Sequence, residues 1–154
     1  MRYNEPLVYV RYLRESCRET AAGVREEAVI EDHPSAVIRR IRKGLPMAEF
    51  EALAEWLKVN DEELAPLLGI SRATFHRRRK AGHLEAPESE KLIRFARLLR
   101  RATEVLEEEE SAREWLKSPA VAFGGETPLS FADTEIGARE VEYLLGRLVH
   151  GVFS

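Results

Sequence analysis

The residues best suited to chemistry lie in one short cationic stretch near the middle of the chain. Five Lys or Arg side chains fall between positions 72 and 80, and one aromatic residue, Phe75, interrupts them. Arginine can pair with guanine through two parallel hydrogen bonds, and lysine or threonine can bond phosphates or bases. Contacts to phosphates release counterions, so binding of this kind depends on salt. The side chains expected to face nucleic acid are Ser71, Arg72, Thr74, His76, Arg77, Arg78 and Lys80.

No other group of residues has the spacing of a catalytic or metal site. The four histidines are His33, His76, His83 and His150. None of them has a second histidine at the spacing of a His-Glu-x-x-His zinc site, and the Gly124-Gly125 pair is too short to cradle a phosphate. Cys17 is the only cysteine, which excludes a disulfide or cysteine-built metal site within the chain. We therefore expect a protein that is not an enzyme, with no catalytic residue, no cofactor and no metal.

Composition places the chain among folded proteins that do not cross a membrane. Hydrophobic residues make up 44% and charged residues 33% of the 154 positions, which argues against wholesale disorder. No stretch approaches the roughly 20 apolar residues that a membrane span needs. The N-terminus lacks the basic-then-apolar order of a signal peptide. We expect a cytoplasmic location.

Charge is unevenly distributed along the sequence. Residues 1–34 carry 5 Lys/Arg against 7 Asp/Glu, residues 35–101 carry 15 against 9, and residues 102–154 carry 4 against 11. A basic middle and an acidic end suggest two different partners, one of them a polyanion. The alternative is that these charges lie on solvated faces and bind nothing.

Proline and glycine divide the chain into segments with helical periodicity, so we predict an all-α fold. The expected helices are 7–22, 35–43, 46–57, 61–68, 72–81, 88–110, 111–117 and 135–150, with a short turn or helix at 129–133. The first of these also fits a strand. The long segment 88–110 has a wide apolar face, which suits either a dimer interface or the core of its own domain. The acidic run 107–110 at its end is expected to mark a frayed junction between domains.

Two short helices around position 69 have the pattern of a helix-turn-helix. Leu64 and Leu68 face inward, Gly69 permits the turn, Ser71 caps the next helix and Phe75 anchors it. In this motif the second helix presents its N-terminal side chains to base edges in the major groove. Specific binding by so small a unit would need a dimer on a two-fold site. A three-helix domain that binds protein is the alternative.

With these segments in place, the chain resembles the Xre/MbcA/ParS family of antitoxins, in particular those paired with RES-domain toxins. The resemblance covers roughly residues 34–154. It rests on the combination of a helix-turn-helix with a series of motifs built from Trp-Leu, Gly-Gly-x-x-Pro-Leu, Thr-x-x-Gly and a terminal Gly. The segments that carry it are 41–46, 64–75, 112–119, 123–129, 134–141 and 144–151.

The resemblance implies a type II antitoxin with two activities. It would neutralise a cognate RES-domain toxin that degrades NAD by covering the toxin's active site, and it would repress its own operon by binding double-stranded operator DNA, as a homodimer. The matching toxin-binding positions are Phe123, Gly124, Gly125, Thr127, Arg147, His150, Gly151, Val152, Phe153 and Ser154. The implied domains are 34–110, an Xre-like helix-turn-helix domain with a long dimerisation helix, and 111–154, the toxin-binding domain. Residues 1–33 are an N-terminal extension that matches no family motif.

Two other interpretations fit the same residues. One is a free-standing helix-turn-helix transcriptional regulator whose C-terminal domain dimerises or senses a ligand. The other is a protein-interaction scaffold with no role on DNA.

For the antitoxin, the acidic surroundings of the C-terminal tail suggest that it meets a basic cleft in the toxin, which normally holds an anionic dinucleotide.

Overall fold

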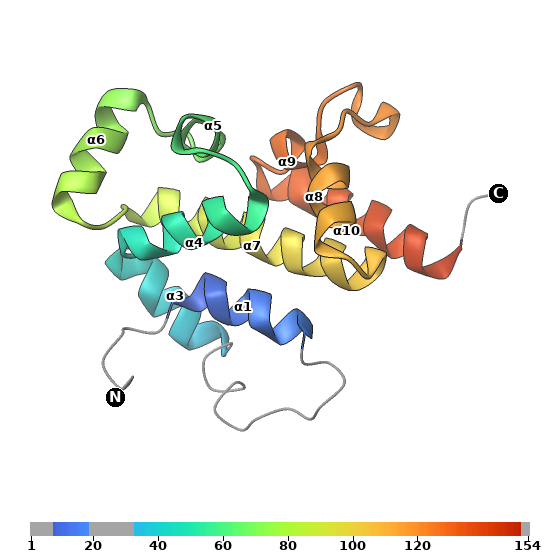
Figure 1. Cartoon of the computed structure of the whole chain (residues 1–154), viewed down its shortest axis with the longest axis horizontal. Coiled ribbons are helices and arrows are strands. Elements are labelled where there is room, and N and C mark those ends of the chain that lie inside the picture. Colours follow the sequence, from blue (N-terminus) through green and yellow to red (C-terminus); the bar gives the residue numbers. More distant parts are fainter. Residues whose placement is uncertain (1–7, 19–32, 152–154) are drawn as a thin grey trace.

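The computed structural model describes residues 8–18 and 33–151. This part of the chain is helical and contains no β-strand, as predicted (Figure 1). Its elements are α1 (Tyr9–Arg18), α3 (Pro34–Lys43), α4 (Met47–Leu57), α5 (Asp61–Leu67), α6 (Arg72–Ala81), α7 (Ala86–Leu106), α8 (Glu109–Lys117), the 3-10 turn η1 (Val121–Phe123), α9 (Pro128–Phe131) and α10 (Glu135–His150). The proposed toxin contacts Val152, Phe153 and Ser154 lie outside the described residues.

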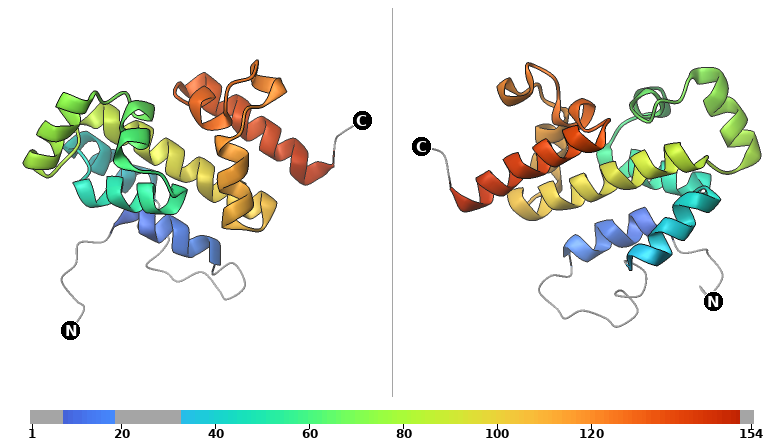
Figure 2. Two further views of the ribbon diagram at one scale, coloured as in Figure 1. Left: turned by 45° about the horizontal axis from the view of Figure 1, so that its top comes forward. Right: turned by 180° about the vertical axis from the view of Figure 1, so that it is seen from behind.

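Helix α7 runs through the centre of the molecule and organises the core (Figures 1 and 2). Helices α1, α3, α4, α8 and α10 all contact it. Leu92, Phe95 and Leu99 are fully buried on it, and Ile93 and Leu98 are nearly so. The wide apolar face of this segment is therefore covered by helices of the same chain, and its width alone gives no reason to expect a second copy there.

Helix α7 ends at Leu106, earlier than the sequence pattern predicted. Glu107 adopts a left-handed conformation with a φ of 69°, and α8 starts two residues later at Glu109. Carboxylates are unfavourable near the C-terminus of a helix and favourable in its first turn. The turn at Glu107 therefore moves Glu109 and Glu110 from the unfavourable end of one helix to the favourable start of the next.

The junction between α7 and α8 is held by ion pairs and is not frayed as expected. Glu109 accepts two hydrogen bonds from Arg14 of α1, both at 3.0 Å. Glu110 accepts from Arg113 at 2.7 Å and from Lys58 at 3.2 Å. The acidic run thus ties α8 to α1 and to the end of α4.

Two cations of α8 also complete the C-terminus of α4. The buried Arg113 donates to the carbonyl oxygen of Trp56 at 3.1 Å, and Lys117 donates to that of Leu57 at 3.1 Å. The last carbonyls of a helix have no partner within it, and cations are favourable at this end. Helix α8 therefore supports the end of α4, which in turn contacts α1 and α7.

Residues 9–18, for which the sequence indicated no role, form α1 and complete the core. Tyr9, Val10 and Leu13 are fully buried. The buried carboxylate of Glu49 accepts hydrogen bonds from the backbone N–H groups of Tyr9 at 2.6 Å and Val10 at 2.8 Å. Burial raises the pKa of Glu49, and this effect exceeds the lowering that the two hydrogen bonds cause.

A bilayer-spanning helix would have to be both long and apolar throughout. Among the helices of the described ranges 8–18 and 33–151, none is long and apolar enough to cross a membrane.

Candidate nucleic-acid and partner interfaces

Helices α5 and α6 form the predicted helix-turn-helix. Asn60 and Glu63 cap α5 reciprocally, with both side chain to backbone hydrogen bonds at 2.9 Å. Gly69 makes the turn with a φ of 74°, and Ile70 is buried in the angle between the helices. Ser71 caps α6 as predicted, because its hydroxyl oxygen accepts from the Thr74 N–H at 3.2 Å.

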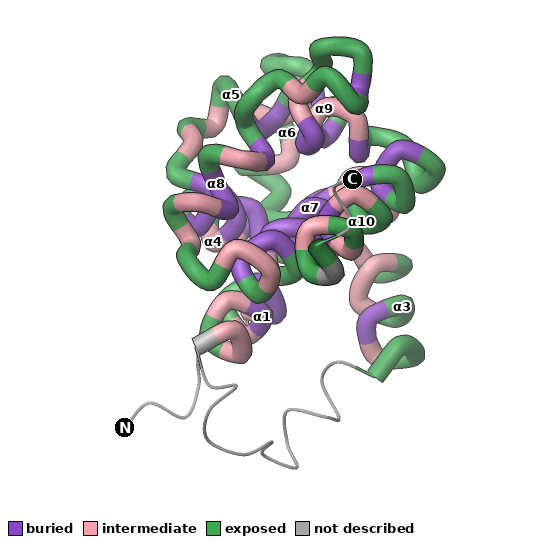
Figure 3. Tube along the Cα trace, turned by 90° about the vertical axis from the view of Figure 1, so that its right-hand side faces the viewer, coloured by how far each residue is buried: buried purple, intermediate pink, exposed green. Residues whose placement is uncertain are grey.

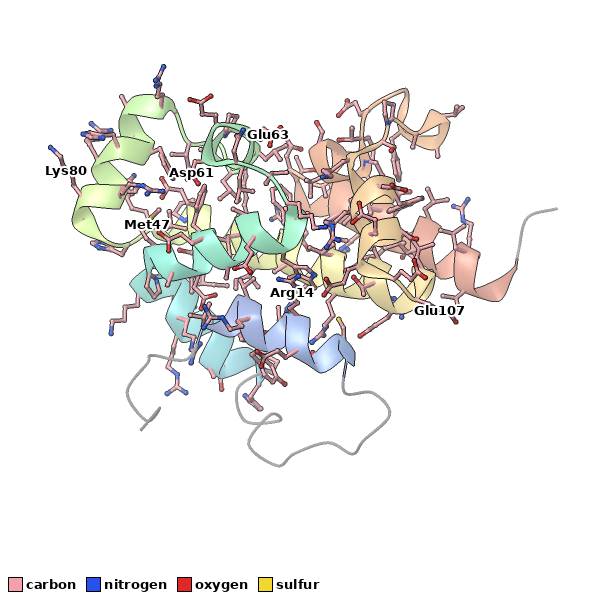
Figure 4. All side chains as sticks on the ribbon, in the orientation of Figure 1. Arg14, Met47, Asp61, Glu63, Lys80 and Glu107 are labelled. Carbon is pink, nitrogen blue, oxygen red and sulfur yellow. The ribbon has the colours of Figure 1, made fainter. Side chains whose placement is uncertain are left out.

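Helix α6 stands at one edge of the molecule and none of its residues is fully buried. Its anchor is Phe75, whose ring lies 4.9 Å from that of Phe50 in α4. The guanidinium of Arg79 lies over the Phe75 ring, 5.1 Å from its centroid, and donates to Asp61 of α5 at 2.7 Å. Figure 4 shows Lys80 projecting outward from this edge. The helix therefore offers most of its surface to solvent.

Four of the predicted nucleic-acid contacts share the exposed surface of α6: Arg72, His76, Arg77 and Lys80. Arg77 donates to the hydroxyl of Thr74 at 3.1 Å, and Ser71 donates to the same hydroxyl at 3.0 Å. This short network holds the guanidinium of Arg77 against Thr74, in the first turn of the helix. The arrangement suits a base-reading arginine, because its orientation is set before any ligand arrives.

Arg78 points elsewhere. Its guanidinium bonds Glu88 of α7 at 2.9 and 3.1 Å and pairs with Glu85 at 3.2 Å, and its side chain is only 18% exposed. Burial of Glu88 works to raise the pKa of that carboxyl, but the hydrogen bonds from Arg78 and from the Glu85 N–H outweigh it and lower the pKa. Arg78 therefore attaches α6 to α7, whereas the sequence pattern placed it with the nucleic-acid contacts.

In the C-terminal part, two of the expected toxin contacts have structural roles. Phe123 is buried and stacks on Phe131, with ring centroids 4.6 Å apart. Thr127 caps α9 by accepting from the Ser130 N–H at 3.1 Å. Phe123 was predicted as a toxin contact; in the structure its ring packs between η1 and α9.

The remaining part of this loop is open to solvent. Gly124 and Gly125 are exposed, with φ values of 64° and 90° that favour glycine. Val121, next to them, is 98% exposed. This residue was not singled out from the sequence, although an apolar residue beside a Gly-Gly turn is a usable signal. The exposed Val121 side chain therefore gives the loop a small apolar tip that faces solvent.

Helix α10 presents a second exposed surface. Thr134 caps it through the Gly137 N–H at 3.0 Å, and Gly151 ends it with a φ of 61°. Ile136 is 77% and Tyr143 63% exposed; Arg147 is exposed as well. Figure 3 shows exposed residues along the outer side of this helix. Ile136 and Tyr143 are seven positions apart and off the buried stripe, which is the sequence signal for a second apolar face.

The fold and these surfaces define a helix-turn-helix protein with an additional helical unit at its C-terminus. Residues 36–97 match the family model described as the antitoxin Xre-like helix-turn-helix domain. Residues 101–151 match the model of the antitoxin Xre/MbcA/ParS C-terminal toxin-binding domain. The chain belongs to this family of Xre antitoxins, which confirms the resemblance.

Three similar proteins are named as antitoxins, and two of them as Antitoxin Xre. Antitoxin Xre of Yersinia enterocolitica is 31% identical over 138 residues, which cover 88% of this chain and 93% of that protein. Antitoxin Xre of Photorhabdus laumondii is 31% identical over 116 residues, covering 74% and 78%. The Prs ADP-ribosylating antitoxin of a Sphingobium species is 24% identical over 124 residues, also covering 74% and 78%.

Proposed function

We propose that this antitoxin neutralises a cognate RES-domain toxin, which degrades NAD, and represses its own operon. The proposal is supported by one arrangement: a cationic helix and the toxin-binding region lie at opposite ends of the same molecule. Helix α6 lies at one end of the long axis, and the last turns of α10 project at the other (Figure 1). The molecule can therefore engage DNA and a protein at the same time. Residues 34–110 would serve the first purpose and residues 111–154 the second.

DNA recognition would use the exposed side of α6. Arg72 is the first residue of the helix, and the guanidinium of Arg77 is bonded to Thr74 in its first turn, so both charges lie toward the end that reaches base edges in this motif. His76 and Lys80 flank them on the same surface. We expect two copies of the chain to bind a two-fold operator, because one small helix-turn-helix offers little contact area.

The DNA assignment is tested with the fragment upstream of the protein's own operon. The double variant Arg72→Ala/Arg77→Ala should weaken binding by about 1–3 kcal/mol for each of the two arginines that pairs with a base. If either arginine binds a phosphate instead, the slope of log K against log salt should fall by roughly 0.9 for that arginine. Arg101→Ala, an exposed cation on α7, is the matched control and should leave affinity unchanged. Unchanged affinity in the double variant would refute the assignment.

Neutralisation would use the loop with Gly124 and Gly125, and the end of α10 with the tail that follows it. The proposed contacts there are Arg147, His150, Gly151, Val152, Phe153 and Ser154. Arg147 is exposed in the last turn of α10, and the end of this helix projects at one side of the molecule (Figure 2).

The toxin assignment is tested by co-expression with the product of the adjacent gene. Full-length protein should restore growth, and a chain that stops after Arg147 should not. The shortened chain should still bind the upstream DNA fragment, which controls for folding. Full rescue by the shortened chain would refute the role of the tail. Failure of the full-length chain to rescue would favour the free-standing regulator instead.

A further inference from the structure

Helix α3 carries exposed cations that belong to neither the DNA contacts nor the toxin contacts proposed above. Arg39, Arg42 and Lys43 are exposed, and within the described part of the chain none of their side chains forms a hydrogen bond or an ion pair. Cations in the last turn of a helix favour its dipole, which is one role for Arg42 and Lys43. That effect does not account for Arg39, which lies before the last turn.

The segments that follow α3 and α6 are bonded to each other. Residues 45–47 and 82–84 form an isolated antiparallel bridge, with N–H to O distances of 2.8 and 3.0 Å. The approach is close, because a Cβ added at Gly44 would collide with the carbonyl oxygen of Leu84. The C-terminal ends of α3 and α6 are therefore held side by side, at the same end of the molecule (Figures 1 and 2).

The charge along this shared edge has one sign. Residues 33–48 carry four Lys/Arg and residues 70–84 carry five, and neither segment contains a carboxylate. Lys43 ends α3 and Lys80 lies in the last turn of α6. Figure 4 shows Lys80 and Met47 at the same end of the molecule. A surface of this kind attracts a polyanion.

The carboxylates that follow these two segments in the sequence do not offset the charge. Glu49 is buried and accepts hydrogen bonds from backbone N–H groups of α1. Glu85 and Glu88 pair with Arg78, at 3.2 and 2.9 Å. Because Arg78 takes up these two charges, the exposed cations of α3 and α6 remain available to a ligand.

Double-stranded DNA offers phosphates at the positions that these cations would meet. The major groove that admits a recognition helix is about 12 Å wide, and a phosphate backbone borders it on each side. With α6 in the groove, cations beside the end of α6 would face one of these backbones. Contacts of this kind fix the position of a protein on the duplex and carry no sequence information.

We propose that Arg39, Arg42 and Lys43 of α3 bind the phosphate backbone of the duplex whose bases α6 contacts. The inference rests on the proposed DNA-binding function and deepens it, since it assigns the anchoring of the duplex to a helix outside the helix-turn-helix motif. Helix α3 sets the position of the chain on DNA, and α6 supplies the contacts to bases.

Salt titration of DNA binding by the full-length chain tests the inference on two duplexes, the fragment upstream of its own operon and an unrelated sequence of equal length. Arg39→Ala/Arg42→Ala/Lys43→Ala should weaken binding to both duplexes by the same factor. The slope of log K against log salt should fall by roughly 0.9 for each cation removed per bound chain. For three cations, the advantage of the unmodified chain over the variant should shrink by roughly 40-fold between about 50 and 200 mM salt.

Two control variants separate phosphate contacts on α3 from a general loss of charge. Arg39→Lys/Arg42→Lys keeps the charge and should keep the slope. Arg101→Ala/Arg139→Ala/Arg147→Ala removes three exposed cations from α7 and α10 and should leave both affinity and slope unchanged. Circular dichroism should show the same helix content in all variants, because the substituted side chains are exposed.

The possible outcomes distinguish this inference from the proposed function. An unchanged slope in the α3 variant overturns the inference, and so does an equal fall in the α7 and α10 variant. If the unmodified chain shows no preference for the upstream fragment, operator recognition fails, whereas the α3 contacts are still measured on the unrelated duplex. If the unmodified chain binds neither duplex, both are overturned.

Discussion

Two glycines of α10 allow a sharp test of how the C-terminal unit is packed. At Gly137 an added Cβ would lie 2.8 Å from the carbonyl carbon of Phe131 and closer still to its oxygen. At Gly146 it would meet nothing within 4 Å. Both residues lie in the same helix, so Gly→Ala gives each a similar gain of about 0.5–1 kcal/mol from helix propensity. Only Gly137→Ala also forces α9 away from α10.

The obstacle at Gly137 is backbone, which cannot turn aside as a flexible side chain can. Overpacking of this kind costs about 1–3 kcal/mol, so the two variants should differ by that amount in their free energy of unfolding. Gly146→Ala should be slightly more stable than the unmodified chain, and Gly137→Ala clearly less stable. The physical reason for glycine in the Thr134-x-x-Gly137 motif is then the close approach of the Phe131 carbonyl to the first turn of α10.

Urea unfolding followed by tryptophan fluorescence measures the difference, since Trp115 lies on α8, which contacts α9. The midpoints can be compared only if the free energy of unfolding depends on urea concentration with the same slope in both variants. If Gly137→Ala proves as stable as Gly146→Ala, the packing of α9 against α10 described above is wrong.

The other predictions concern single residues and the isolated chain. Phe123→Ala should destabilise the fold by about 3–5 kcal/mol because it leaves a cavity beside Phe131, whereas Val121→Ala should have almost no effect in the same thermal melts. Because the pKa of Glu49 is raised, its contribution to the free energy of unfolding is present at acid pH and is lost as pH rises through the folded-state pKa. Glu49→Gln should therefore flatten the loss of stability in unfolding experiments measured over a pH series. The lowered pKa of Glu88 acts in the opposite sense: stability should fall as pH drops below the ordinary glutamate value, and less so in Arg78→Ala. The purified chain alone should not consume NAD in an absorbance assay, and measurable turnover would contradict a function without catalysis.

Local signals explain which parts of the fold were predictable. Ser71 was expected to cap a helix and Gly69 to permit the turn before it, and each does so. A cap or a left-handed glycine depends only on residues three or four positions away. Periodicity likewise gave the long central helix, although not its end at Leu106.

The misplaced residues depend on contacts between segments distant in the sequence. Whether Arg78 reaches DNA or Glu88 is decided by the angle between α6 and α7, which no pattern within either helix encodes. Phe123 is buried because Phe131 folds back upon it. Glu49 lies on a helix that was predicted, but its buried role depends on Tyr9 and Val10 of α1, which are 40 and 39 residues away in the sequence.

The support that α8 gives to α4 bears on how the protein would be removed from a cell. Trp56 and Leu57 end the helix against which Phe75 rests, and their carbonyls depend on Arg113 and Lys117. A protease that consumes the chain from its C-terminal end would therefore strip the DNA-reading half of its own scaffold before reaching it. Loss of α8 would thus open both halves of the chain, and hydrogen exchange should show the two halves opening together.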